Sequence, residues 1–437
     1  MDSSWIESAN SPTCDFPLHN LPYCVFRASD GQSRIGVAIG DQILDLTRLS
    51  LNITLPCSDA LQQPNLNTLM AEGAQKNSVL RAELIRLLED RPSRLRDQPE
   101  LVSEVLVSAE HCKFKLPIQV GDYSDFYSSL FHATNVGAMF RPDQPLLPNY
   151  KHIPIGYHGR SSSVVVSGTG IMRPSGQVSP QPPDERPGFG PSRRLDYELE
   201  LGVVIGCGNE LGTSIDISEV RESIFGICLL NDWSARDLQK WEYQPLGPFL
   251  AKSFATTLSP ILVTTEAIEP FRCPAFQRDD ADPAPLDYLM DDIDQEKGGI
   301  DLTMEVFLTS SQMRDSGLEP FKISSGNFSS MYWTIGQLVA HHSSNGCNLR
   351  AGDLLGSGTV SGSDRTERGC LLERNWDGAF GDPVSGSQRT PLDLPTGEKR
   401  DFLEDGDEIT LTAFCEKDGV GRIGLGSCSG RILPAKT

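Results

Sequence analysis

The sequence has no long apolar run and no signal-peptide pattern. None of its apolar stretches approaches the roughly 20 residues that a helix needs to cross a bilayer. The first residues, Met1-Asp2-Ser3-Ser4-Trp5, lack the basic and apolar regions of a secretory signal. We therefore expect neither a membrane protein nor a secreted one.

Paired cysteines are also missing. The eleven cysteines are scattered singly and form no CxxC motif, which argues against a zinc ribbon and against a small disulfide framework. An odd number of dispersed thiols is typical of a reducing compartment. A cytoplasmic protein is therefore expected.

Positive charge is scarce. The chain has 38 Lys and Arg residues against 59 Asp and Glu residues, a formal net charge of -21. Nucleic acid and anionic membranes would be repelled on balance, so neither is expected as a partner. No Gly-Lys-Ser or Gly-Lys-Thr follows the glycines at 356–362, so a phosphate loop is not expected either. A metal cation suits this charge balance.

The N-terminal part reads as strands followed by helices. A chain of 437 residues is too long for one typical domain. Residues 16–48 predict short strands, with a hairpin turn at Gly40-Asp41. Residues 58–95 predict helix, because leucines recur there at three- and four-residue spacing, and Pro92 is the predicted stop. We predict a small strand-plus-helix domain over 1–117.

The remainder, 118–437, is punctuated by Gly and Pro and predicts short strands with few helices. A Pro-rich loop is expected over 168–194 and a polar excursion over 270–300. Ser234 is predicted to cap a helix that runs through Tyr243. The fold class is therefore mainly β with α (α+β), and the second domain is a mixed β-roll or sandwich.

The segment Leu195–Ile205 predicts a strand with an unusual face. Alternation places Asp196, Glu198 and Glu200 on one side and apolar residues on the other. Carboxylates in line repel one another unless water bathes them or a cation neutralises them. From this segment alone, a solvated outer face and a cation site are about equally supported.

Other segments add candidate ligands and catalytic groups. Asp125 lies in a polar segment before His132, and Asp232 lies where an apolar strand meets a helix. With Glu198 and Glu200 they make four carboxylates without a Cys or His ligand, a donor set that favours calcium or magnesium over zinc. Their spacing is not that of an EF-hand.

His132 suits a general base because imidazole changes charge near neutrality, although a lone helical His is more often structural. Arg236 and Gln239, three apart, share a helix face and could reach one oxyanion. Lys252, between apolar and small residues, suits a partly buried cation, with a surface lysine as the alternative.

These residues lie in long motifs: GDYSDFYSSLFHATNVG (121–137), PIGYHGR (154–160), LDYELELG (195–202), NDWSARDLQKWEYQPLGPFLAKSFATTLSP (231–260) and GTVSGS (358–363). In them the chain resembles the fumarylacetoacetase family over nearly its whole length. The segment RIGVAIGDQILDL (34–46) is similar to that family's small SH3-like N-terminal β domain. The stretch at 139–144 departs from the family's pattern just after Arg141.

The resemblance implies the roles of individual residues. It implies calcium held by Asp125, Glu198, Glu200 and Asp232, and a second cation, often magnesium, near Lys252 and Thr256. His132, oriented by Glu373, would activate water, and Arg236, Gln239 and Lys252 would form an oxyanion hole. The implied substrate contacts are Tyr127, Arg141, Tyr157, Gln239, Tyr243 and Thr359.

The implied activity is metal-dependent hydrolysis of the carbon–carbon bond of 4-fumarylacetoacetate to fumarate and acetoacetate, the last step of tyrosine and phenylalanine catabolism, by a homodimer. An acylpyruvate hydrolase or oxaloacetate decarboxylase, activities of shorter members of the superfamily, is the alternative, and the N-terminal domain argues against it. A calcium-binding module without catalysis is a third hypothesis. A base and anion-stabilising donors beside the carboxylates argue against that one.

Overall fold

The structure is a computed structural model that describes residues 3–28, 30–180, 185–380 and 388–436. Its N-terminal part is built on a five-stranded sheet in the order β4-β3-β2-β1-β5. The strands are β1 (Tyr23–Arg27), β2 (Ser33–Ile39), β3 (Gln42–Asp45), β4 (Leu106–Ser108) and β5 (Lys113–Lys115). The hairpin at Gly40-Asp41 is confirmed, since Ile39 pairs with Gln42 across it and Gly40 has a φ of 57°.

Five α-helices share a core with this sheet: α1 (Leu46–Asn52), α2 (Ser58–Leu61), α3 (Asn67–Ala71), α4 (Ala74–Leu88) and α5 (Pro99–Val105). The predicted leucines of α4 are buried. The helix ends at Leu88, before Pro92, because Glu89 already has an extended backbone. The N-terminal β domain is thus confirmed, whereas its boundary at residue 117 stays a prediction.

Two large sheets form the framework of the rest of the chain. The larger has eight strands in the order β7-β6-β22-β13-β14-β16-β8, with β17 also paired to β14. Its strands are β6 (Tyr123–Phe126), β7 (Gly156–His158), β8 (Val164–Val166), β13 (Leu199–Ile205), β14 (Ile224–Asp232), β16 (Thr256–Leu258), β17 (Val263–Thr264) and β22 (Leu354–Gly356).

The second sheet has the order β21-β20-β25-β26-β9. It comprises β9 (Ile171–Met172), β20 (Thr303–Thr309), β21 (Phe321–Asn327), β25 (Glu408–Lys417) and β26 (Gly421–Leu433). Apolar residues of both sheets, such as Leu201 and Leu425, belong to one buried core. The predicted α+β fold, mainly of strands, is confirmed.

Short elements complete this part. Two-stranded pairs are β10 (Ser175–Val178) with β11 (Gly188–Pro191), β12 (Leu195–Asp196) with β15 (Ser234–Ala235), β18 (Arg272–Cys273) with β19 (Gly299–Ile300), and β23 (Leu392–Asp393) with β24 (Lys399–Arg400). The helices are α6 (Leu130–Phe140), α7 (Val220–Ser223), α8 (Arg236–Glu242), α9 (Thr265–Ile268), α10 (Asp292–Lys297), α11 (Ser311–Asp315), α12 (Ile335–Ser343) and α13 (Leu371–Arg374). The loop predicted over 168–194 was wrong in part, because it contains β9, β10 and β11.

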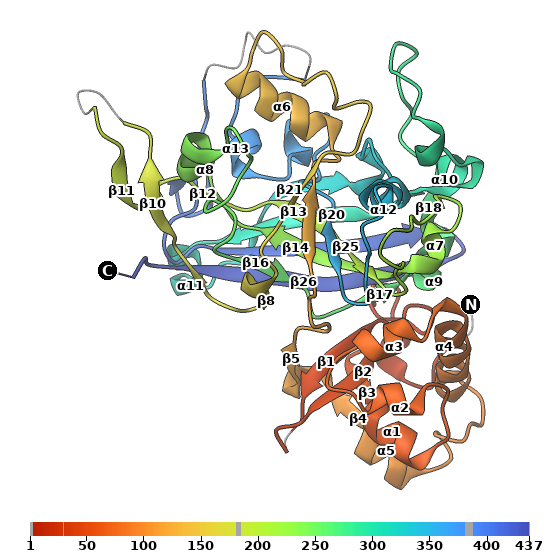
Figure 1. Cartoon of the computed structure of the whole chain (residues 1–437). Coiled ribbons are helices and arrows are strands. Elements are labelled where there is room, and N and C mark those ends of the chain that lie inside the picture. Colours follow the sequence, from red (N-terminus) through yellow and green to blue (C-terminus); the bar gives the residue numbers. More distant parts are fainter. Residues whose placement is uncertain (1–2, 29, 181–184, 381–387, 437) are drawn as a thin grey trace.

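Figure 1 shows the N-terminal part packed at one end of the larger part, with α6, α8 and α13 at the opposite end. A second core joins the two parts, since Val204 of β13 and Leu354 of β22 are buried with Ile35 and Leu69 of the N-terminal part. Within the described residues, every helix is too short or too polar to cross a membrane.

Candidate active site

The four carboxylates predicted as metal ligands come together on the large sheet. Asp125 lies on β6, Glu200 on β13 and Asp232 at the end of β14, and Glu198 lies in the break between β12 and β13. Each is at most 5% exposed. Each offers one oxygen to a group in which all four atoms lie within 4.8 Å of one another. Four buried carboxylate oxygens this close together suit a hard divalent cation.

The protein alone does not neutralise all of this charge. Burial, followed by repulsion from Asp232, raises the pKa of Asp125 to about 8. Burial and the neighbouring Asp125 likewise raise the pKa of Glu200 well above its usual range. Asp125 Oδ1 and Glu200 Oε1 are buried and accept no hydrogen bond from the described residues. A bound cation would stabilise these carboxylates in their charged form.

Gly356 of β22 leaves space beside the same two carboxylates. A Cβ atom at this position would lie 2.5 Å from Asp125 Oδ1 and 2.8 Å from Glu200 Oε2. Any larger residue would therefore displace both carboxylates. The donor set, its charge and this space all fit a calcium or magnesium ion.

Lys252 borders the carboxylate cluster and is buried. Its Nζ donates to Glu198 Oε2 at 2.5 Å and to Asp232 Oδ2 at 2.7 Å, while Thr256 Oγ1 donates to Asp232 Oδ1 at 2.9 Å. Burial would raise the pKa of Glu198, but Lys252 and Arg236 together hold it below its usual range. A protonated ammonium has no lone pair, so Lys252 can neighbour a cation but cannot ligate it.

Arg236 is the first residue of α8 and points back toward the strands. Its Nη1 donates to Glu198 Oε1 at 2.6 Å and to Gln239 Oε1 at 3.2 Å, and its Nε donates to Asp196 Oδ2 at 3.0 Å. Its Nη2 is buried and has no partner among the described residues. Gln239 accepts through Oε1, and its amide NH2 has no hydrogen-bond partner among the described residues, so it can donate to another group.

Ser234 does not cap α8, so that prediction was wrong. The residue before the helix is Ala235, which makes no side-chain cap. Ser234 is extended because it pairs with Asp196 in β15 and β12, and its hydroxyl donates to the carbonyl of Asp232.

The strand that carries Asp196, Glu198 and Glu200 is interrupted at 197–198. All three carboxylates are buried, so the solvated face considered from the sequence was wrong. Glu198 and Glu200 belong to the carboxylate cluster, whereas Asp196 binds Arg236 and the backbone amides of Leu371 and Leu372.

His132 lies on α6 with its Nδ1 hydrogen-bonded to Glu373 Oε2. Helix α6 starts at a fixed point because the Ser129 side chain accepts from the His132 amide at 3.1 Å. Glu373, on α13, is fully buried. With Nδ1 held by a carboxylate, Nε2 is the nitrogen left to accept a proton.

Sequence reasoning missed the residues that hold Glu373 in place. Asn135 Nδ2 and Ser361 Oγ each donate to its carboxylate at 2.9 Å, and Cys370 Sγ lies 3.3 Å from it. Burial would raise the pKa of Glu373, but His132 and these donors lower it to about 2. The one available signal was that Asn135 follows His132 by three residues and so shares its helix face.

The residues predicted to contact the substrate differ in the contacts that they make with His132 and the carboxylate cluster. The Tyr127 ring stands edge-on to the His132 ring at 5.3 Å, and Tyr157 OH donates to Asp232 Oδ2 at 3.0 Å. The Thr359 hydroxyl and Arg141 Nε are buried without a partner among the described residues. Tyr243 follows α8, and its ring centroid lies 6.1 Å from that of Phe140, the residue before Arg141.

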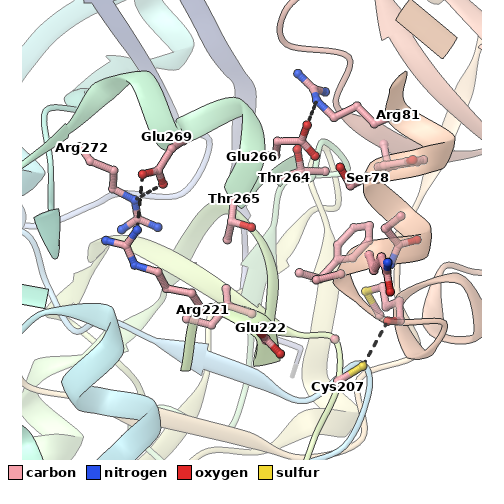
Figure 2. A pocket seen from close by; sticks show the side chains of 18 residues that line it. Ser78, Arg81, Cys207, Arg221, Glu222, Thr264, Thr265, Glu266, Glu269 and Arg272 are labelled. Atoms are coloured by element: carbon pink, nitrogen blue, oxygen red, sulfur yellow. Dashed lines mark hydrogen bonds and ion pairs between the residues drawn. The ribbon is translucent and has the colours of Figure 1, made fainter. Parts of the chain in front are cut away.

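A separate cavity of about 510 Å³ lies between the two parts of the chain, lined by α4, α7 and α9 among others. Figure 2 shows its charged residues: Arg81 faces Glu266, and Arg221 and Arg272 both face Glu269. Its arginines thus have carboxylate partners, and none of the predicted site residues lines it. The candidate active site is therefore the group around the four carboxylates.

Comparisons with known proteins agree with this arrangement. The family model described as fumarylacetoacetate hydrolase C-terminal matches residues 123–433, and that described as fumarylacetoacetase N-terminal matches 19–117. The fumarylacetoacetase of Homo sapiens is 48% identical, with 96% of this chain and 97% of that protein covered. The fumarylacetoacetase of Arabidopsis thaliana is 46% identical, with 96% of each covered.

Solved structures share the fold. A fumarylacetoacetate hydrolase from Exiguobacterium antarcticum aligns over 95% of this chain and 100% of its own, at 17% identity and a TM-score of 0.50. A putative HpcE protein from Mycobacterium smegmatis aligns over 94% and 99%, at 19% identity and a TM-score of 0.52. With two family models matched in order along the chain and relatives nearly half identical, the chain belongs to the fumarylacetoacetate hydrolase family of enzymes.

Proposed function

We propose that this protein hydrolyses 4-fumarylacetoacetate to fumarate and acetoacetate. Its relatives at 43% to 48% identity over at least 96% of the chain are named fumarylacetoacetase. The observation that carries the proposal is that Glu198 belongs to the carboxylate cluster and binds both Arg236 and Lys252. Asp196 in turn links Arg236 to the helix that carries Glu373, the partner of His132. A base, anion-stabilising donors and a cation site are thus joined by one set of contacts.

His132 starts the reaction as general base. Its Nε2 takes a proton from water, and Glu373 balances the positive charge that the imidazole gains. A positioned base typically contributes about 10²–10⁴ in rate. The water oxygen bonds to the carbonyl carbon on the fumaryl side, which places negative charge on the carbonyl oxygen.

Arg236, Gln239 and Lys252 stabilise that oxygen. The free Nη2 of Arg236 and the amide NH2 of Gln239 come from one face of α8, and Lys252 adds a positive charge. Losing one such donor costs about 10²–10³ in rate. The carbon–carbon bond then breaks, its electron pair leaves as the acetoacetate enolate, and the imidazolium returns the proton to carbon.

Members of this family depend on a metal, and Asp125, Glu198, Glu200 and Asp232 would hold calcium in this chain, with magnesium near Thr256 and Lys252 as a second cation. A divalent cation bound there would act as a Lewis acid toward the dioxygen unit of the substrate. Arg141 suits a substrate carboxylate, because guanidinium binds carboxylate through two parallel hydrogen bonds. Tyr127, Tyr157, Tyr243 and Thr359 would contact the rest of the substrate.

The proposal is tested by following the loss of near-ultraviolet absorbance of 4-fumarylacetoacetate with purified protein, calcium and magnesium. Fumarate and acetoacetate should appear in equal amounts by NMR, and an acylpyruvate offered in parallel should react far more slowly. No turnover of fumarylacetoacetate would refute the proposal. If His132→Ala were fully active, the role of His132 as base would be wrong.

A role in tyrosine and phenylalanine catabolism follows from this activity. A homodimer and a cytoplasmic location are further predictions for this chain. Light scattering after size-exclusion chromatography tests the first, and fractionation of the source cells tests the second.

A further inference from the structure

Asp196 is 0% exposed and accepts four hydrogen bonds from the described residues, all from N–H groups. Its Oδ1 accepts from the amides of Tyr197 at 2.9 Å and Leu371 at 2.8 Å. Its Oδ2 accepts from the amide of Leu372 at 2.9 Å and from Arg236 Nε at 3.0 Å. Because every partner is a donor, both oxygens must be acceptors, and only a carboxylate provides that.

These hydrogen bonds connect two groups of residues in the candidate active site, the group around His132 and the carboxylate cluster. Leu371 and Leu372 begin α13, the helix that carries Glu373, the partner of His132. Arg236 begins α8 and donates to Glu198 in the carboxylate cluster. The elements β12, α8 and α13 lie together at the same end of the molecule in Figure 1. One carboxylate therefore holds both a guanidinium and the start of the helix behind the base.

We propose that Asp196 is a positioning residue for hydrolysis, an inference that rests on the proposed function. It is not one of the four clustered carboxylates. It determines where Arg236 directs its free Nη2 and where Glu373 meets His132. Without it, the hydrogen bonds that Arg236 keeps with the described residues are those of its Nη1, and the amides that begin α13 lose this acceptor.

Asp196→Asn is the sharpest change, because asparagine has the same shape but would turn an NH2 group toward two N–H donors. Asp407→Asn is the matched control. Asp407 is also buried, and it accepts from Arg400 Nε at 2.8 Å, from Arg400 Nη2 at 3.1 Å and from the Glu404 amide at 2.8 Å. None of its partners is a predicted site residue.

The experiment measures kcat and KM for fumarylacetoacetate and the rise in Tm on adding calcium. Asp196→Asn should lower kcat by about 10- to 100-fold with KM changed by less than about threefold, because a misplaced donor weakens transition-state binding most. Calcium should still raise its Tm, since the four clustered carboxylates are intact. Asp407→Asn should lose stability while kcat changes by less than about twofold.

An inactive wild-type protein would refute the proposed function, and with it the reaction that Asp196 is inferred to serve. The inference itself is overturned if the wild type is active and Asp196→Asn keeps its kcat, or if both Asn variants lose kcat equally. Should Asp196→Asn fail to fold, Asp196→Glu replaces it, since it keeps both acceptor oxygens and moves them by one methylene. Its kcat should fall with KM retained, and an unchanged kcat would contradict the proposal.

Discussion

Among single residues, Asp125 makes the clearest link between pH and metal binding. Its pKa is about 8 in the metal-free protein because of burial and the charge of Asp232. A protonated carboxyl must lose its proton to bind a cation, so the affinity for calcium should fall by up to about tenfold per pH unit below pH 8. Titration calorimetry at pH 6.5, 7.5 and 8.5 should show this fall and the release of protons. A constant affinity across this range would contradict it.

The raised pKa of Asp125 makes the metal-free protein less stable at high pH, the opposite of its effect on calcium affinity. Because the pKa of Asp125 is raised from its ordinary value of 3.8, its contribution to stability is complete below pH 3.8 and is lost as pH rises through 8. Calcium should therefore raise the Tm more at pH 8.5 than at pH 6. Equal shifts at both values would show that this carboxylate does not limit stability.

A substitution at Gly356 tests whether the space beside Asp125 and Glu200 is needed to bind the cation. In Gly356→Ala the new methyl group would meet Asp125 Oδ1 at 2.5 Å and Glu200 Oε2 at 2.8 Å, so we expect at least about a hundredfold loss of calcium affinity and of kcat. Gly202→Ala, on the paired position of β13, is the control, because its Cβ would meet only side chains, at 3.1 Å or more. It should keep calcium binding. Equal losses in both variants would mean general disruption of the sheet.

Among the elements, helix α6 positions the general base His132 through a hydrogen bond in its first turn. Ser129 Oγ accepts from the His132 amide and donates to the Ser361 carbonyl, and Ser361 in turn donates to Glu373. Ser129→Ala should therefore cost about 1 kcal/mol of unfolding free energy and also lower kcat. Ser310→Ala removes a buried cap of α11 and should cost similar stability without lowering kcat. Urea unfolding and initial rates measure both effects.

The sequence predicted elements best where local pattern decides them. Alternation was enough for β2 and β3, and leucine spacing was enough for α4. Local pattern did not predict the extended backbone of Ser234 or the break in the strand at 197–198. Both depend on the pairing of β12 with β15, which joins residues some forty positions apart. Asp125 and Asp232 could be recognised as candidate ligands from the residues around them. Glu373 lies on a four-residue helix without a sequence pattern, so its role was predicted only from the family resemblance.

In the molecule as a whole, the N-terminal part and the catalytic part share a core. Val204, Phe225 and Leu262 pack into the N-terminal cluster, and Tyr23 exchanges backbone hydrogen bonds with Leu262. A protein truncated to 118–437 would expose this surface, so we expect it to aggregate, and the full chain should unfold in one calorimetric transition. A monodisperse, active truncated protein would contradict this expectation.

The proposed function requires above all that a cation bind among Asp125, Glu198, Glu200 and Asp232. The most direct test is a crystal structure with manganese as an anomalous substitute for the cation and acetoacetate as bound product. Anomalous density is expected within ligand distance of these four carboxylates, with the acetoacetate oxygens directed toward the ion. Density away from Glu198 and Glu200 would contradict the assigned roles together.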